Sequence, residues 1–228
     1  RKVRLGRTAI ISQIVRVGVR SVFIISLVSS CVGLILALQM APPLDEFGRK
    51  DAVANITGVA VLRELGPLIA AIVLTGFAGA AIAAEIGTMV VGEEIEALEA
   101  HALNPVRFLV LPRVIATVIS MTALAVLSDL VALVASWGIS MFALGIPSQL
   151  YIDNTLEQVK RIDFLTGIGK ATVFGLLIGL IACTNGLRVT GGAAGVGKAT
   201  TGTVVQSVVS IVVADLMFTA MFYAIGWV

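Results

Sequence analysis

The residues with the clearest chemical pattern form a near match to a phosphate-binding loop. Gly192, four further residues, Gly197 and Lys198 follow the order of that motif. The next residue is Ala199, where the motif needs a serine or threonine hydroxyl to hold magnesium. An apolar segment precedes the motif, in place of the required β-strand. We therefore interpret residues 188–202 as a glycine-rich loop between two apolar segments, and we predict no ATP binding by this sequence.

Charged side chains beside or inside apolar segments are costly in a membrane and often functional. Arg63 and Glu64 precede Gly66-Pro67, which is a helix-start signal. The pair could bind a zwitterionic or phosphate-bearing head group, or its two members could neutralise each other; the residues leave both interpretations open. Asp215 lies within an apolar run. For this residue we favour a structural pairing with a polar group such as Asn185 over an ion path.

Residues typical of catalytic or metal sites are few. The chain has one histidine, His101, and two cysteines, Cys31 and Cys183, which fall inside apolar runs. Cysteines in such runs usually behave as small buried hydrophobes. The sequence shows no nucleophile–base pair and no metal-ligand cluster, so we expect no enzyme activity, no cofactor and no metal site. The Arg113 side chain is expected to reach along its stem to the membrane interface.

The composition indicates a membrane protein. Hydrophobic residues make up 58% of the 228 residues and charged residues only 13%, whereas a soluble domain carries about 25% charged residues. Apolar stretches of about 18 or more residues can cross a bilayer as helices, which pair every backbone group internally. We predict an all-α polytopic membrane protein with one domain, residues 1–228. Its five membrane spans are predicted at residues 21–40, 65–84, 108–146, 167–187 and 203–228.

Proline and small residues give these spans their expected ends and contacts. Pro42 and Pro43 are expected to end the first span. The second half of the second span, residues 76–84, is nearly all small residues, which predicts a close helix contact. The run 108–146 is long enough for one helix or for a hairpin.

The distribution of basic residues decides between these alternatives. The loop after residue 187 carries Arg188 and Lys198 without an acid up to residue 200, which favours the cytoplasmic side. Residues 1–20 are basic, with apolar residues at helical spacing, and predict an interfacial helix on the cytoplasmic face. A plain positive flank is an alternative with the same orientation. The N-terminus and the loop after residue 187 can both lie in the cytoplasm only if the run 108–146 crosses the membrane once.

With a cytoplasmic N-terminus and two spans before residue 85, the acidic segment after this residue faces the cytoplasm. Residues 93–100 are rich in strong helix formers, and Asn104-Pro105 ends the helix. Ile95 and Leu98 share one face, and glutamates surround it. A short helix with an apolar ridge and acidic flanks suits a groove in a partner protein. A solvated loop helix without a partner is the alternative.

Several segments resemble the MlaE/YrbE-type permease family. The resemblance covers essentially the whole chain and is most specific between residues 85 and 113. The matching segments are RELGP at 63–67, AEIGTM at 84–89, EEIEALE at 93–99, NPVR at 104–107, LPR at 111–113, Gly186, GVG at 195–197 and ATT at 199–201. The chain departs from the family pattern at Val90, at Gly92 and at His101-Ala102, where Met-Gly is common in the family.

The resemblance implies the permease subunit of an ABC transporter that moves phospholipids between membranes, with ATP hydrolysis on a separate subunit. It implies a homodimer with a lipid cavity between the two copies. The implied partners are a cytoplasmic ATPase subunit, an MCE-domain lipid-binding protein on the outer side and a small STAS-type regulatory subunit, without nucleic acid. The implied location is the bacterial inner membrane, and the chloroplast inner envelope is the less favoured alternative.

Site residues follow from the same resemblance. Arg63 and Glu64 match residues that line the lipid cavity, so head-group contact is expected of them. The helix 93–100 matches a coupling helix that seats on the ATPase subunit. The residues expected to make this coupling contact are Glu93, Glu94, Ile95, Leu98 and Glu99.

Two functions from other classes remain as alternatives. An ion-coupled secondary transporter could be built around Asp215, but paired membrane carboxylates and recognisable inverted repeats are missing from the sequence. A membrane scaffold that holds a lipid-binding partner would transport nothing. An ATPase subunit that copurifies in stoichiometric amount would separate the first alternative from the ABC permease.

Overall fold

The computed structural model describes residues 7–227 and contains helices but no strand in this range. The helices are α1 (Arg7–Val17), α2 (Val22–Glu46), α3 (Val53–Ala60), α4 (Gly66–Leu74), α5 (Ala80–Val91), α6 (Glu94–Ala100), α7 (Leu111–Phe142), α8 (Ser148–Gln158), α9 (Arg161–Leu187) and α10 (Gly192–Ile225). Five helical runs are long and apolar enough to cross a membrane: Thr8–Glu46, Lys50–Val91, Val106–Phe142, Arg161–Leu187 and Gly192–Ile225. The predicted all-α polytopic membrane protein is thereby confirmed.

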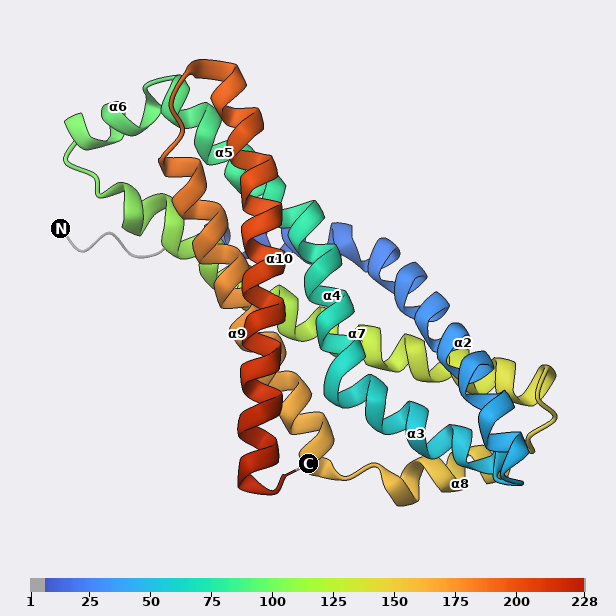
Figure 1. The fold of residues 1–228 in the computed structure, drawn as a ribbon. Coiled ribbons are helices and arrows are strands. Elements are labelled where there is room, and N and C mark those ends of the chain that lie inside the picture. The colour runs from blue at the N-terminus through green and yellow to red at the C-terminus, as the bar shows by residue number, and fades with distance from the viewer. Residues whose placement is uncertain (1–6, 228) are drawn as a thin grey trace.

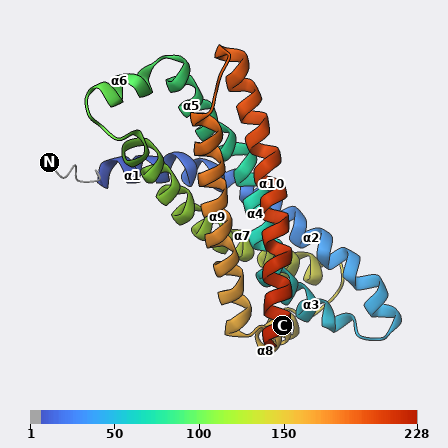
Figure 2. The same ribbon diagram turned by 60° about the vertical axis from the view of Figure 1, so that its left-hand side comes forward.

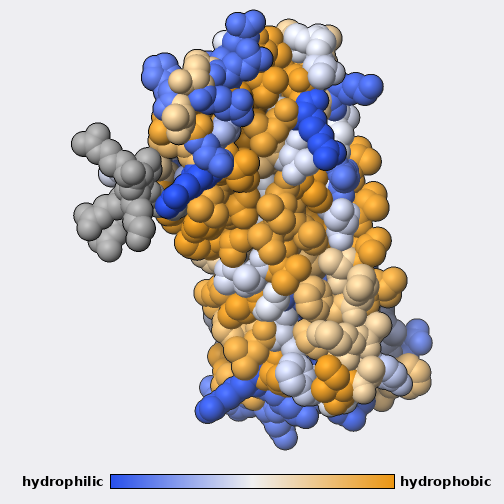
Figure 3. All heavy atoms as spheres, turned by 90° about the vertical axis from the view of Figure 1, so that its left-hand side faces the viewer, coloured by the Kyte–Doolittle hydropathy of each residue, from blue (hydrophilic) through white to orange (hydrophobic). Residues whose placement is uncertain are grey.

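The helices form an elongated bundle with two distinct ends. α6 and the turn between α9 and α10 lie at one end, called here the α6 end (Figures 1 and 2). α8 and the turn between α2 and α3 lie at the other, called the α8 end. On the face seen in Figure 3, a broad hydrophobic band separates two hydrophilic ends. A chain that spans a bilayer needs such a band.

The first two long runs are longer than their predicted spans. Pro42 and Pro43 lie inside α2, which continues to Glu46, so the prediction that they end the helix is wrong. Packing overrides the local signal here, because Ala37 and Ala41 are buried in a cluster with residues of α3 and α8. The helix therefore continues through the prolines.

The second run is continuous over Lys50–Val91, and it does not begin at residue 65. Two π-helical turns interrupt its α-helical pattern, at Val61–Leu65 and at Thr75–Gly79. Gly66 and Pro67 follow the first of these turns inside the helix, although their sequence resembles a helix start. A π-helical turn already departs from regular i to i−4 pairing, and a proline is more easily accommodated after it.

The run 108–146 forms one helix over most of its length, as predicted. α7 is continuous over Leu111–Phe142 and packs against α2 and α9. It spans about 48 Å at 1.5 Å per residue, more than the bilayer core of about 30 Å. Figure 1 shows α7 and α2 inclined to α9 and α10.

Small residues allow the closest helix contacts. A Cβ atom added to Gly33 of α2 would overlap the backbone of Ala132 in α7. A Cβ added to Gly186 of α9 would lie 3.1 Å from the carbonyl oxygen of Ala83 in α5. The second contact confirms the tight packing predicted for residues 76–84.

The glycine-rich segment predicted as a loop is mostly helical. Only residues 188–191 form the connection, and α10 begins at Gly192. The near match to a phosphate-binding loop therefore lies in the first turns of a helix, and α9, not a strand, precedes it. This placement agrees with the prediction that the motif does not bind ATP.

Candidate functional site

A buried lysine lies at the centre of an ionic cluster in the half of the bundle nearer the α8 end. Lys170 Nζ lies 2.6 Å from Glu64 Oε2 and 2.9 Å from Asp215 Oδ1. Its side chain is only 1% exposed. The Thr219 hydroxyl lies 2.9 Å from Lys170 Nζ and donates to Glu64 Oε1 at 2.9 Å. We call Glu64, Lys170, Asp215 and Thr219 the lysine cluster.

Three helical runs bring the lysine cluster together. Lys170 lies nine residues into α9, and Asp215 lies ten residues before the end of α10. Both are therefore about 15 Å from the α8-end terminus of their helix. Glu64 lies in the π-helical turn Val61–Leu65. Such turns are frequent at functional sites.

Arg63, the neighbour of Glu64, makes a separate ion pair. Its Nε and one terminal nitrogen both lie 2.7 Å from Asp163 Oδ1. The other oxygen of Asp163 accepts a hydrogen bond from the Lys160 backbone N–H at 2.8 Å. Asp163 is 1% exposed and Arg63 20% exposed. This pair fixes the start of α9 against the second helical run.

The structure excludes one of the two alternatives left open for Arg63 and Glu64, and it gives Asp215 a partner other than the one suggested. Arg63 and Glu64 do not neutralise each other, because each has its own partner on α9. Asp215 does not pair with Asn185, whose amide nitrogen donates to Thr203 and Gln206 at 3.1 Å each. Lys170 takes that role, as a basic residue inside the apolar span of α9. A single charged residue in an apolar span, such as Asp215, thus indicates a buried partner of opposite charge.

The chemistry available at the lysine cluster is binding and charge compensation. Two carboxylates surround one ammonium group, so the three ionised groups sum to one negative charge. Glu64 is 35% exposed, whereas Asp215 is 15% exposed. The exposed edge of the cluster is therefore a carboxylate. Within residues 7–227, no group of three or more histidine, cysteine, aspartate or glutamate side chains could hold a metal ion.

α6 projects from the opposite end of the bundle (Figure 1). Glu93 before it and Ala102 after it have φ angles of 57° and 56°, in the left-handed region. The four glutamates Glu93, Glu94, Glu96 and Glu99 are exposed, whereas Ile95 and Leu98 are half-buried. The predicted apolar ridge is thus partly covered from within the chain, and the acidic flanks face outward.

A cavity of about 310 Å³ lies beneath α6. Leu98 and His101 line it from the α6 side and Phe108 from the segment before α7. His101 Nδ1 lies 2.7 Å from the carbonyl oxygen of Ala97, so the ring covers the end of α6.

Ion pairs connect α5, the helix that precedes α6, to the N-terminal helix α1 and to α7. Glu85 of α5 pairs with Arg16 of α1 and with Arg113 of α7, the latter at 3.4 Å. Arg113 also donates to the carbonyl oxygen of Leu109 at 3.0 Å and is 8% exposed. The expectation that Arg113 reaches to the interface is wrong, since the side chain is buried and bonds to Leu109 and Glu85 within the bundle. α1 lies across the bundle axis at this level (Figure 2).

Comparison with known proteins identifies the family. A family model described as Permease MlaE matches residues 10–221. The chain belongs to the MlaE permease family. A probable ABC transporter permease protein of Rickettsia prowazekii is 35% identical over 216 residues, which cover 95% of this chain and 83% of that protein. A probable ABC transporter permease protein of Synechocystis is 32% identical over 220 residues, 96% of this chain and 84% of the relative.

A plant relative extends the family beyond bacteria. The chloroplastic protein TRIGALACTOSYLDIACYLGLYCEROL 1 of Arabidopsis thaliana is 33% identical over 213 residues, which cover 93% of this chain and 61% of that protein. Family membership and the five apolar helical runs make this MlaE-family chain a multi-pass permease subunit.

Proposed function

We propose that this chain is the permease subunit of an ABC transporter that moves phospholipids between membranes, driven by ATP hydrolysis on a separate subunit. α6 carries the proposal. It is an acidic helix that projects from one end of a membrane bundle, and its glutamates are exposed. Exposed carboxylates on a short helix, with an apolar cavity behind it, suit insertion into a groove of a partner protein.

In this proposal the α6 end faces the cytoplasm and α6 acts as the coupling helix. ATP binding moves the ATPase subunit, and α6 transmits that movement to α5 and α7, to which its two ends are connected. Glu85 ties α5 to α1 and α7. A push on α6 therefore acts on three helices together. The contacts proposed for the ATPase subunit are made by Glu93, Glu94, Ile95, Leu98 and Glu99.

The lysine cluster is proposed to face the lipid cavity on the outer side. The Glu64 side chain is 35% exposed and lies beside the buried Lys170. Arg63, also part-exposed, lies next to it in the chain. A part-exposed carboxylate and a part-exposed guanidinium on neighbouring residues offer both signs of charge to a zwitterionic phospholipid head group. The name of the plant relative contains that of a glycolipid, which supports a lipid substrate.

The proposed assembly contains further subunits. Two copies of the chain form a homodimer with the lipid cavity between them, and an MCE-domain lipid-binding protein docks at the α8 end. A small STAS-type regulatory subunit binds on the ATPase side. We place the complex in the bacterial inner membrane, with the chloroplast inner envelope as the alternative. Exposed apolar residues on α10, such as Val209, Val213 and Met217, offer a surface for lipid or for the second copy.

The coupling role is tested by a triple variant of α6. Glu93→Gln, Leu98→Ala and Glu99→Gln together remove two charges and one apolar contact. We expect at least about a tenfold loss of the ATPase subunit in gentle-detergent copurification. A loss of about 1.4 kcal/mol of binding free energy lowers the affinity tenfold. The matched control is a triple variant of α8, Asp153→Asn, Leu156→Ala and Glu157→Gln, whose side chains are exposed at the other end. Normal ATPase copurification with the α6 variant would refute the coupling role.

The head-group role is tested by Glu64→Gln and Arg63→Gln. Each substitution removes one charge; Glu64→Gln also keeps the shape of the side chain, whereas Arg63→Gln shortens it and removes the pairing with Asp163. Each should lower phospholipid transport in a complementation assay while the chain still reaches the membrane in normal amount. Transport at the wild-type rate in both variants would rule out head-group contact by these residues.

The alternative function, an ion-coupled transporter that uses Asp215, has less support. Asp215 contacts Lys170, and this ion pair already compensates its charge. A transport rate that follows the ion gradient and not ATP would favour that alternative.

A further inference from the structure

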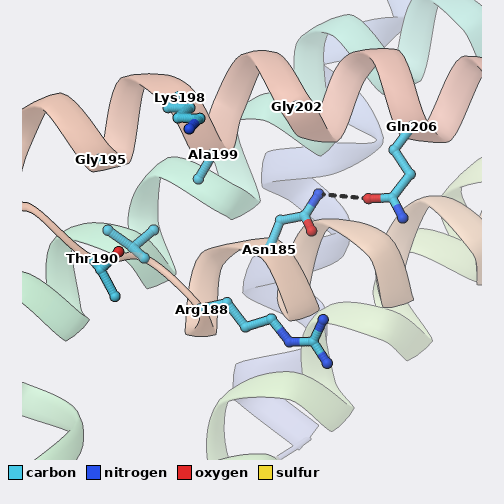
Figure 4. A pocket seen from close by; sticks show the side chains of 9 residues that line it. Asn185, Arg188, Thr190, Gly195, Lys198, Ala199, Gly202 and Gln206 are labelled. Atoms are coloured by element: carbon cyan, nitrogen blue, oxygen red, sulfur yellow. Dashed lines mark hydrogen bonds between the residues drawn. The ribbon is translucent and has the colours of Figure 1, made fainter.

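A cleft lies at the α6 end, between the C-terminal end of α9 and the first turns of α10. Its volume is about 340 Å³. Asn185 and Arg188 line it from the α9 side, and Lys198, Gly202 and Gln206 line it from α10. Figure 4 shows the lining residues, with Asn185 and Gln206 facing each other across the gap and Arg188 projecting from the end of α9. We call it the α9–α10 cleft.

The α9–α10 cleft is lined by two cations and by no carboxylate. Arg188 and Lys198 are both exposed, and neither has an ion-pair partner within residues 7–227. Two uncompensated positive charges across one small cleft attract an anion.

The neutral side chains of the cleft also favour an anion. Asn185 Nδ2 donates to Gln206 Oε1 at 3.1 Å (Figure 4). This hydrogen bond occupies the carbonyl oxygen of Gln206 and leaves its amide NH₂ as a donor. Among the lining residues, Arg188, Lys198 and Gln206 therefore offer hydrogen-bond donors. A phosphate group, with several strong acceptor oxygens, is the anion that such donors bind best.

The surroundings of the cleft favour a lipid as the source of that phosphate. The cleft lies where the polar turn meets the apolar part of α10. Val205 and Val209, on the next turns of α10, are 59% and 57% exposed. Acyl chains attached to a phosphate in the cleft could lie along this apolar surface. A soluble phosphate compound would gain nothing from it.

We propose that the α9–α10 cleft binds the phosphate group of an anionic ligand through Arg188 and Lys198. This site lies at the opposite end from the lysine cluster, so it is a second binding site and not part of the proposed lipid cavity. It requires neither an ATPase partner nor transport. In the membrane it holds a phospholipid of the leaflet at the α6 end.

Two variants test the cleft in different ways. Arg188→Gln combined with Lys198→Gln removes both charges and leaves a shorter, neutral polar side chain at each position. Gly202→Leu fills the cleft, and a Cβ at this position would meet no atom within 4 Å, so the fold can accept the change. The charge-matched control, Lys50→Gln combined with Arg161→Gln, removes one lysine and one arginine at the α8 end.

Binding is measured by native mass spectrometry of the full chain in a neutral detergent. The probes are phosphatidylglycerol, diacylglycerol without phosphate, and glycerol 3-phosphate. We expect the wild type and the control to retain one phosphatidylglycerol more per chain than the charge variant and Gly202→Leu. The expected fall in affinity is at least about tenfold, because two charge-assisted contacts are lost. Diacylglycerol should not bind at this site.

The probes also distinguish the two sources of phosphate. Retention of phosphatidylglycerol but not of glycerol 3-phosphate assigns a lipid ligand, and equal affinity for both assigns a soluble phosphate compound. Equal retention of phosphatidylglycerol and of glycerol 3-phosphate by the wild type and by both cleft variants would overturn the proposal, as would no binding of either to the wild type. Because no ATPase or transport is involved, failure here leaves the proposed transport function untouched.

Discussion

Lys170 is almost fully buried in an apolar helix, and its charge is compensated by Glu64 and Asp215 from two other helical runs. Burial of an unpaired ammonium group in lipid or protein costs several kcal/mol, so the three side chains depend on one another. The lysine cluster therefore connects α9 and α10 to the π-helical turn that carries Glu64. Its role as a head-group contact remains a proposal.

Lys170→Met should strongly destabilise the chain. It leaves two carboxylates facing each other without a cation, and loss of one partner from a buried ion pair costs about 3–5 kcal/mol. Thermal unfolding in detergent measures this change. The triple variant Glu64→Gln, Lys170→Met and Asp215→Asn removes all three charges and should recover most of the lost stability. If the single and triple variants unfolded at the same temperature, mutual charge compensation would be refuted.

Ala102 adopts a left-handed conformation after α6, with φ of 56°. This conformation costs a non-glycine residue about 1–2 kcal/mol, a cost that glycine would avoid. Ala102→Gly should stabilise the segment by about 1 kcal/mol and slow amide hydrogen exchange in residues 94–103 about fivefold. Ala100→Gly, inside α6, should have the opposite effect. Faster exchange in Ala102→Gly would contradict this account of the turn.

At the scale of the helices, the close contact of α2 and α7 depends on a missing side chain. Gly33 packs directly on the backbone of Ala132, and Ser29 and Ser128 share a hydrogen bond of 2.7 Å nearby. Small residues and hydroxyl pairs of this kind are what hold helices together in lipid, where apolar burial between helices gains little.

Gly33→Ala should separate α2 from α7 and destabilise the chain by about 1–3 kcal/mol. The control is Gly138→Ala in α7, because a Cβ at Gly138 would meet no atom within 4 Å. This control should be neutral or stabilising, since alanine favours the helix over glycine by up to about 1 kcal/mol. Thermal unfolding of the two variants gives the comparison, and a Gly33→Ala variant as stable as the wild type would show that the two helices are not held in close contact.

Helix existence was predictable from the sequence, and helix ends were not. The long apolar runs predicted the five membrane-length helical runs, including the single helix of residues 108–146, but not the helix α8. Pro42, Pro43 and Pro67 mislead because packing with distant residues and a π-helical turn accommodate them. Neither effect can be recognised from the residues next to each proline in the sequence.

At the scale of the whole molecule, charged residues were recognisable but their partners were not. Arg63, Glu64 and Asp215 attract notice as charges in or beside apolar segments. Their partners Asp163 and Lys170 come from α9, about 100 residues away from Arg63 and Glu64, and only the fold brings them together. The α9–α10 cleft was not predictable for the same reason. In the sequence, Arg188 and Lys198 indicate only which side of the membrane the loop after residue 187 faces.

The whole-molecule account has the α6 end bind an ATPase and the α8-end half of the bundle handle lipid. Native mass spectrometry of the complex, purified in gentle detergent, tests both halves at once. We expect two copies of this chain with an ATP-hydrolysing subunit and bound phospholipid, and loss of that subunit in the Glu93/Leu98/Glu99 triple variant. A complex without an ATP-hydrolysing subunit, or one that retains it in the triple variant, would contradict the account.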